Sequence, residues 1–384
     1  MNFYKKLLKP NGKIIIAIEN QLGLKYFLGH EEDHLGKPFL GVQNKYSHKG
    51  VRTFGKEEKI KIINDSGFNN YSFFYPFPDY KLPKVILNND ALSCDELNCS
   101  DLIYMTESRS YSDKYKPLYD EKLSWPVLER NQILGDMANS FLVVIQNSDT
   151  ENCNYDLASL YTTNRSKYFN TETNFSRRHE EIIVKKQKLY DKKAANSYIV
   201  HKVSDTKYET GQNLEVLIYK DLQNGNLESF YDHIKVWISF LKEHALKKKS
   251  DKIINSIVYG EYFDCLPSNL IIKDKNLIYI DKEWLIDKEI TLSYVILRYL
   301  FEIKSFRSFK RKVGSFKKFV DKVVLDSGLI EMNNAHIIKY KTLELEIKEI
   351  IYKDSRSGPW GGSALNVIAK KIKYFLTTKV TPGS

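Results

Sequence analysis

Apolar and polar positions along the first 90 residues alternate in blocks that predict strands and a helix in turn. The run of isoleucines after a Pro-Asn-Gly turn predicts a buried strand from Lys13 to Ile18. In residues 51–70, isoleucines at helical spacing predict a helix that is capped by Thr53 and ends at Gly67. An aromatic strand, a proline-rich turn and another strand follow, so the pattern predicts half of an α/β sheet.

Two polar residues, Glu19 and Asn20, come directly after the first predicted strand. Ligands of open α/β sheets collect outside the carboxyl ends of the strands, so both residues are candidate ligand contacts. The alternative is an ordinary strand exit. A second candidate is the sequence Glu-Glu-Asp-His at 31–34, in which Glu32 and His34 are candidates for acceptor binding or general-base catalysis. There the alternative is a solvated loop.

The rest of the first region is less regular. Residues 90–120 are polar and rich in tyrosine and predict a long loop, whereas 125–146 predict a helix and a terminal strand. Aromatic residues around Asp79 either wall a sugar pocket or fill a core, and the pattern favours neither interpretation. The polar stretch at 148–157 marks a domain boundary.

The strongest candidate chemistry lies around a predicted β-hairpin in the second half of the chain. Two apolar runs flank a polar turn, with Asp264 and Asn269 before the hairpin and Asp281 after it. Magnesium prefers oxygen ligands, which Asn269 and Asp281 supply, and a separate acid such as Asp264 can accept the proton of an attacking hydroxyl. The alternative is a surface hairpin whose acids only make turns.

These segments carry a resemblance to a known family. FDCLPSN at 263–269 and LIYIDKEW at 277–284 are similar to the catalytic loop and metal-binding strand of aminoglycoside phosphotransferase-like kinases, although Tyr262 stands where that family has histidine. The resemblance implies ATP and Mg²⁺ as ligands. It also implies these roles for single residues: Asp264 as the base, Asn269 and Asp281 on magnesium, and Glu283 as support.

The same resemblance extends to the strand predicted at 180–186. It implies that Lys185, or its neighbour Lys186, contacts the nucleotide phosphates; a basic surface strand is the alternative. The run EVLIYK at 215–220 is predicted as a further strand, followed by the hinge between two lobes. Residues 232–244 predict an amphipathic helix ahead of the catalytic loop.

The first region resembles a different family. LKPNGKIIIAIEN at 8–20 and the stretch at 67–87 are similar to the fifth and the last two strands of class I S-adenosylmethionine-dependent methyltransferases. IAIENQLGLKYFLG, the EDH at 32–34, VRTF and FYPFPDYKLP look like methyltransferases of bacterial surface-polysaccharide clusters, in which the methyltransferase is joined to a kinase-like domain. The resemblance implies a sugar, sugar-phosphate or glycolipid acceptor, and S-adenosylmethionine held near Glu19 and Asn20.

One part of the methyltransferase pattern is missing. The sequence contains no G-x-G-x-G, the turn on which that family holds its cofactor, and it begins downstream of the place where the turn belongs. We therefore expect a fragment of a longer transferase that does not methylate as an isolated chain. A glycan kinase is one alternative, and a catalytically silent scaffold that docks a glycosyltransferase at the membrane is another.

The net charge of the chain indicates which classes of partner are favoured. The 384 residues include 59 Lys and Arg against 48 Asp and Glu, which gives a formal charge of +11 and favours anionic partners, but no nucleic-acid-binding module is recognisable. Residues 304–324 interleave basic and apolar positions, which suits either an amphipathic helix on anionic lipid or a packed helix with a solvated basic face. The apolar run near the start is far shorter than a membrane span, so we expect a cytoplasmic protein. The lipid-contact alternative for residues 304–324 would place it peripherally at the inner face of the membrane.

Together, these patterns predict an α/β region followed by an α+β region. The first is a partial Rossmann-like methyltransferase sheet over residues 1–146. A kinase-like, two-lobed domain follows at 147–303, and a basic helical tail occupies 304–384.

Overall fold

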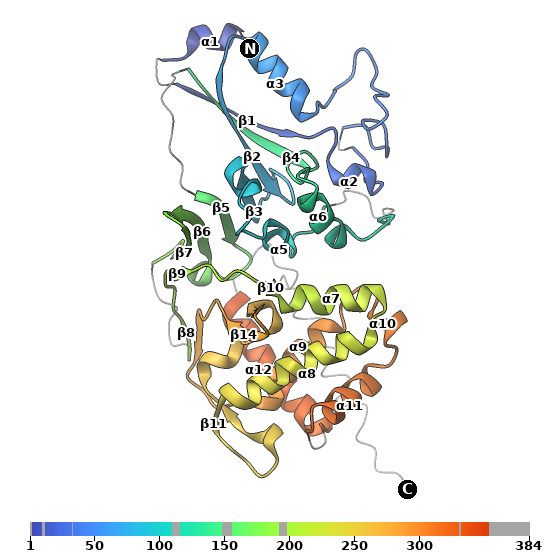
Figure 1. Ribbon diagram of the computed structural model, residues 1–384, viewed down its shortest axis with the longest axis vertical. Helices are drawn as coiled ribbons and strands as arrows, with labels where there is room; N and C mark the ends of the chain where they lie inside the picture. Colours follow the sequence, from blue (N-terminus) through green and yellow to red (C-terminus); the bar gives the residue numbers. More distant parts are fainter. Residues whose placement is uncertain are drawn as a thin grey trace. The chain divides into compact units, whose positions relative to one another are not determined.

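The computed structural model describes residues 2–9, 12–32, 34–109, 116–147, 156–191, 198–329 and 332–352. It has mixed α and β content, with a large, mainly antiparallel sheet and a helical carboxyl-terminal region (Figure 1). The chain divides into two compact units. Unit 1 comprises residues 1–161, 173–186 and 205–210, and unit 2 comprises the remainder. We describe each unit by itself.

Unit 1 is built on a sheet that has eight strands in the described part of the chain. In the order of the sheet, these are β1 (Lys13–Glu19), β4 (Ser140–Gln146), β2 (Asn70–Phe77), β3 (Val85–Asn88), β5 (Asp156–Thr162), β6 (Thr171–Arg178), β7 (Glu181–Lys188) and β9 (Thr206–Lys207). β4 is antiparallel to both of its neighbours, β1 and β2. Consequently β1 and β2 run parallel to each other, and their carboxyl ends reach the same edge of the sheet.

The helices of unit 1 are short, and the longer ones connect the strands. They are α1 (Asn2–Leu7), α2 (Leu24–Phe27), α3 (Lys56–Asp65), α4 (Asn89–Leu92), α5 (Cys99–Ile103) and α6 (Glu121–Arg130). α3 lies on the crossover from β1 to β2, as the sequence predicts, and Gly67 in the left-handed region (φ 76°) follows its end. Its predicted cap is wrong: Gly55 is the N-cap, and Thr53 is hydrogen bonded to Tyr46 instead.

One face of the sheet carries the core of unit 1. Alternate residues of β2 and β4, among them Phe73, Tyr75 and Phe141, are buried, and Phe141 makes edge-to-face contacts with both of the others. The loop predicted at 90–120 is only partly a loop, since α4 and α5 lie at its start. Asn88 and Asn98 cap these helices through their side chains, which stabilises helices too short and polar to be recognised from their pattern.

The strands at 156–188 extend this same sheet. The sequence analysis assigned them to the second domain, but β5 pairs with β3, with Ser159 opposite Ile86. Pairing between strands 70 residues apart cannot be read from local hydrophobic pattern. Lys185 on β7 consequently belongs to unit 1. The predicted boundary at 148–157 falls mostly on residues outside those described.

Unit 2 is mainly helical, with three small sheets in its described part. Its helices are α7 (Leu214–Asn224), α8 (Leu227–His244), α9 (Leu292–Ile303), α10 (Phe309–Lys312), α11 (Phe316–Asp326) and α12 (Asn334–Tyr352), with short 3₁₀ turns η1 (Lys167–Phe169), η2 (Ile253–Asn255), η3 (Gly260–Asp264) and η4 (Pro267–Asn269). Its strands are β8 (Ile199–His201), β10 (Gln212–Asn213), β11 (Leu246–Lys248), β12 (Ile257–Val258), β13 (Leu270–Lys273), β14 (Asn276–Tyr279), β15 (Trp284–Ile286) and β16 (Ile290–Thr291).

Two predictions for unit 2 have opposite outcomes. The hairpin is confirmed, because β13 and β14 pair with Leu270 opposite Tyr279. The strand predicted at 215–220 is wrong, because these residues lie within α7. Asn213 caps this helix, and Leu214, Ile218 and Leu222 recur every four residues on its buried side. The β-branched residues in EVLIYK masked that helical spacing.

The basic segment at 304–324 is not one helix. Gly314 in the left-handed region (φ 83°) separates α10 from α11, and Phe309, Phe319 and Val320 are buried in the core of unit 2. The apolar side of the segment is therefore packed inside the protein. Residues 353–384, the end of the predicted tail, lie outside the described ones. None of the helices described has both the length and the apolar character needed to cross a membrane.

Candidate functional site

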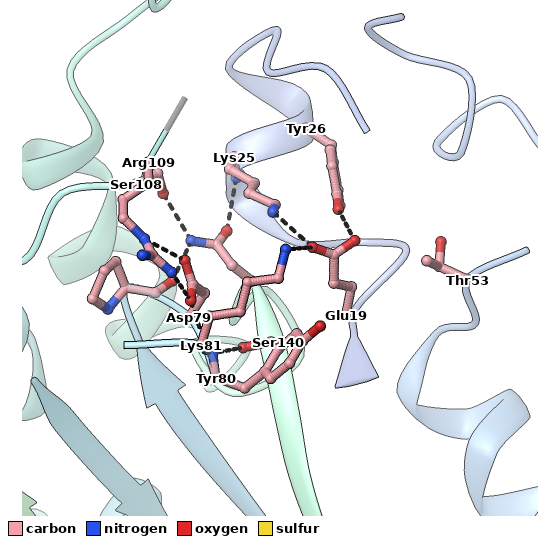
Figure 2. Close-up of polar contacts among 12 residues, drawn as sticks. Glu19, Lys25, Tyr26, Thr53, Asp79, Tyr80, Lys81, Ser108, Arg109 and Ser140 are labelled. Carbon is pink, nitrogen blue, oxygen red and sulfur yellow. Dashed lines mark hydrogen bonds and ion pairs between the residues drawn. The ribbon is translucent and has the colours of Figure 1, made fainter. Parts of the chain in front are cut away.

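Charged residues from three separate segments of unit 1 lie together at the carboxyl ends of β1 and β2 (Figure 2). Glu19 ends β1, and Asp79 and Lys81 follow β2. Ser140 begins β4, the strand that lies between β1 and β2 in the sheet. This edge is where open α/β sheets bind ligands, because loops there leave both strands at the same level.

Glu19 is the most enclosed acid of this group. Its side chain is buried and accepts a hydrogen bond from the Tyr26 hydroxyl at 3.0 Å. The ammonium groups of Lys25 and Lys81 lie 3.4 and 3.9 Å from its Oε1. The Lys81 side chain is 36% exposed, whereas that of Lys25 is 5% exposed. A buried carboxylate is thus balanced by two cations, of which one reaches solvent.

Lys81 is held in place by the loop that follows β2. Asp79 accepts hydrogen bonds from the Lys81 backbone N–H at 2.8 Å and from Arg109 Nε at 2.9 Å. The Tyr80 N–H donates to Ser140 Oγ at 2.8 Å. These bonds fix the loop against β4, so the chain delivers the Lys81 side chain towards Glu19.

Asn20, the other predicted ligand contact, has a different role. It is fully buried, and its Nδ2 donates to the carbonyls of Asp136 and Ala138, each at 2.7 Å. Its Oδ1 accepts the Leu22 N–H at 3.1 Å. Each polar atom of the amide is used within the protein, so Asn20 connects the loops after β1 and before β4 and presents nothing to a ligand.

Glu32 lies in the long loop between β1 and α3 and is 4% exposed. The Tyr46 hydroxyl donates to its Oε1 at 3.2 Å and is also hydrogen bonded to Thr53. Burial raises the pKa of Glu32, and the nearby Glu19 carboxylate raises it further. A Cβ at Gly41 would lie 2.0 Å from Glu32 Oε1, so any other residue at this position would displace the carboxyl. The sequence prediction of Glu32 as a candidate base therefore corresponds to a buried carboxyl beside Glu19.

The rest of the predicted Glu-Glu-Asp-His cluster contributes less. His34 is exposed in the next turn, and among the described residues it has no hydrogen bond or ion pair. Asp33 lies outside the described residues. The structure therefore separates Glu32, which is buried, from His34, which faces solvent.

Lys59 was missed by the sequence analysis. It is buried on α3, and its Nζ donates to the carbonyls of Glu19, at 2.9 Å, and of Phe54. Burial lowers its pKa to about 7. The signal was present in the sequence, since Lys59 lies four residues before the buried Ile63 and hence on the same face of the helix.

In unit 2, the residues predicted around the hairpin do come together. Asn269 Nδ2 donates to the Asp264 carboxylate at 3.0 Å and to the Asp264 carbonyl at 2.9 Å. The Ile280 N–H donates to the Asn269 carbonyl at 2.9 Å, which brings the neighbouring Asp281 to the same end of the hairpin. Asp281 is exposed and has a left-handed backbone conformation (φ 52°), which is uncommon for a residue other than glycine.

A residue not expected from the sequence, Arg298, engages the predicted base. Its Nη1 lies 2.6 Å from Asp264 Oδ1, and its Nε lies 3.9 Å from Glu344 Oε2. Its guanidinium also lies over the Phe263 ring, 4.2 Å from the centroid. Because Arg298 takes one oxygen of Asp264 and Asn269 takes the other, both carboxylate oxygens are already bound within the protein.

Glu283, to which the resemblance gives a supporting role, is engaged by two cationic or ionisable side chains of unit 2. It is buried, Arg165 Nη1 lies 2.7 Å from its Oε1, and His201 Nε2 lies 3.3 Å from its Oε2. Lys185, by contrast, is in unit 1. Among the described residues, no group of three or more His, Cys, Asp or Glu side chains is arranged to hold a metal ion.

Comparisons with known proteins add no identification. No protein-family model, curated protein or solved structure matches this chain.

Proposed function

We propose that this chain recognises a sugar or sugar-phosphate acceptor in the synthesis of a bacterial surface polysaccharide, on the acceptor side of a methyl-transfer reaction. The observation that carries the proposal is the pair of buried carboxyls, Glu19 and Glu32, with Lys81 at the carboxyl edge of the unit 1 sheet. Sugar hydroxyls both donate and accept hydrogen bonds. In this group the carboxylates can accept them, the ammonium groups can donate to them, and the tyrosine hydroxyls can do both.

The residues divide into binding and proton-transfer roles. Lys81, the partly exposed cation, contacts a phosphate or an anionic sugar. Glu32 accepts the proton of the reacting hydroxyl, because its raised pKa brings a carboxylate closer to the range in which a general base is effective. The Tyr46 hydroxyl, which is itself hydrogen bonded to Thr53, orients that carboxyl.

The described residues do not fit S-adenosylmethionine. Every polar atom of Asn20 is bound to the backbone, and Glu19 is engaged by Tyr26 and two lysines. The sequence also has no glycine-rich turn to hold the cofactor's carboxylate. The proposed role of this chain therefore does not include binding the methyl donor. We expect the isolated chain to bind an acceptor without methylating it.

Ligand-observed NMR with monosaccharide phosphates and sugar nucleotides tests the proposal. We expect saturation transfer to at least one such ligand, lost in Lys81→Met and retained in Lys84→Met, which removes an exposed lysine three residues away. Glu32→Gln should retain binding, because a base is needed only for transfer. Equal effects of Lys81→Met and Lys84→Met, or no binding by the wild-type chain, would contradict the proposal.

A second candidate function, magnesium-nucleotide binding by unit 2, rests on the convergence of Asp264, Asn269 and Asp281. Asn269 Oδ1 and the Asp281 carboxylate would hold the metal, which when bound neutralises phosphate charge. Asp264 is engaged through both of its oxygens, so this candidate is nucleotide binding rather than rapid phosphoryl transfer.

Calorimetric titration of the chain with ATP and Mg²⁺ tests this second candidate. Binding should be abolished by Asp281→Ala and left unchanged by Asp287→Ala, which removes an exposed acid beyond β15. If the wild-type chain gives no magnesium-dependent heat, unit 2 does not bind the nucleotide. This result would leave the acceptor proposal for unit 1 untouched.

A further inference from the structure

Unit 2 carries an exposed basic face on and around α10 and α11. Residues 304–328 contain eight Lys and Arg and two Asp, a formal charge of +6 out of +11 for the whole chain. We define the basic face by its exposed members, which are Lys304, Arg307, Lys310, Arg311, Lys317, Lys318 and Lys322. More than half of the excess charge of the protein is thus concentrated in 25 residues.

Most of this charge is not neutralised within unit 2. Lys322 pairs with Asp326, at 2.8 Å. In the part of the chain that the structure describes, no carboxylate forms an ion pair with Lys310, Lys317 or Lys318. Clustered like charges repel each other, which is a cost to the folded state that an anionic partner would relieve.

The apolar residues of the segment are already used by the fold, with one exception. Phe319 and Val323 on α11 are buried, so the helix cannot turn its apolar side into a bilayer. Leu325, however, is 77% exposed. It lies seven residues after Lys318 and three after Lys322, so the three side chains share one side of the helix. The basic face therefore presents a single leucine among its cations.

We propose that the basic face binds the surface of an anionic lipid bilayer, with Leu325 contacting the interface and the core of unit 2 remaining intact. The charge of the face is complementary to such a surface, and two helices joined by a turn offer a broad contact rather than a pocket for one small anion. Nucleic acid is a poorer match. Stacking on bases needs exposed aromatic rings, and among the described residues of 304–329 no aromatic side chain is more than partly exposed.

This mode of contact has a defined strength and salt dependence. Each basic residue near an anionic surface contributes about 1 kcal/mol, which is roughly a fivefold change in partition coefficient. Removing three lysines should consequently lower the partition coefficient about 100-fold. The attraction is screened over about 8 Å at physiological ionic strength, so raising the salt should release the protein.

Co-sedimentation of the full chain with vesicles tests the proposal. The vesicles are pure phosphatidylcholine or an equal mixture of phosphatidylcholine and phosphatidylglycerol. We expect binding only to the mixture. The triple variant Lys310→Gln, Lys317→Gln, Lys318→Gln should lose about 100-fold in partition coefficient. The matched control is Lys247→Gln, Lys248→Gln, Lys249→Gln, which removes the same charge from exposed positions at β11 and should lose far less.

Two further measurements distinguish lipid binding from the alternative of nucleic-acid binding. Leu325→Ser should weaken vesicle binding several-fold without changing its salt dependence, because it removes apolar contact and no charge. A labelled single-stranded oligonucleotide should bind weakly, and equally to both triple variants. The proposal is overturned by absence of wild-type binding to the anionic vesicles, by equal losses in the two triple variants, or by oligonucleotide binding that depends on the basic face while vesicle binding does not.

Discussion

Each unit balances a largely enclosed carboxylate with cations, but the cations come from different kinds of element. In unit 1, Glu19 faces Lys25 of α2 and Lys81 of the loop after β2, and the Lys81 side chain is 36% exposed. In unit 2, Asp264 faces Arg298, which comes from the core helix α9 and is near Glu344 of α12. A lysine on a loop can turn from its carboxylate towards a ligand, whereas an arginine fixed between helices cannot. Lys81 can therefore bind a ligand, and Arg298 stays paired with Asp264.

The strongest test of this contrast is Arg298→Met. The substitution leaves Asp264 without its cation in a largely buried setting, whereas Glu344 keeps Lys348 at 3.2 Å, and we expect unit 2 to lose about 3–5 kcal/mol in the free energy of unfolding. Urea denaturation followed by tryptophan fluorescence measures it. Arg311→Met, at an exposed position, should change the stability by less than about 0.5 kcal/mol. Similar costs for the two variants would show that Arg298 is not a structural ion-pair partner.

A smaller effect is expected from Gly41→Ala in unit 1. The added methyl would overlap Glu32 Oε1 and the Tyr46 hydroxyl, so these two side chains have to shift and their hydrogen bond is disturbed, at a cost of about 1–3 kcal/mol. Gly55→Ala is the control for the added methyl, since its Cβ would meet only Leu22 at 3.8 Å, and its expected cost is limited to the weaker N-cap of α3, at most about 1 kcal/mol. Thermal unfolding compares the two. If both variants melt at the temperature of the wild type, the loop does not hold Glu32 as tightly as the structure indicates.

The smallest expected effect is a change in how the free energy of unfolding depends on pH. The pKa of Lys59 is about 7 in the folded state and about 10.4 in an unfolded chain, so the unfolded state binds more protons between these values. Stability then rises with pH in that window, and Lys59 contributes about 1–2 kcal/mol to the rise between pH 7 and 9. Lys59→Met should remove this part of the rise, and Lys61→Met, on the exposed side of α3, should preserve it. Chemical denaturation at the two pH values measures the difference, and parallel pH profiles for both variants would contradict the assignment.

The elements that could be predicted from the sequence are those with a strong local signal. The strand at β1, the helix α3 and the β13–β14 hairpin follow from isoleucine runs and from glycine or polar turns. α7 could not be recognised in the same way, because branched residues in EVLIYK favour a strand locally, and the Asn213 cap and the packing of Leu214 decide otherwise.

The candidate sites show the same limit. The grouping of Asp264 with Asn269 follows from their spacing, and the position of Glu19 follows from the strand it ends. Arg298 could not be found, because it meets Asp264 across 34 residues through the packing of α9. The cations that surround a buried acid are set by tertiary contacts, so they cannot be predicted from local sequence patterns.

Among the strands that the structure describes, β1 is at one edge of the unit 1 sheet, and this has a consequence for its backbone. Hydrogen bonds at Gly12 and Asn20 show that even-numbered residues of this strand face β4, so the N–H groups of Lys13, Ile15 and Ala17 point away from it. Ile15 is also 67% exposed. Deuterium should therefore enter β1 at every second amide, fast at the odd positions and slowly at the even ones, and an added peptide strand that docks along this border would abolish the alternation.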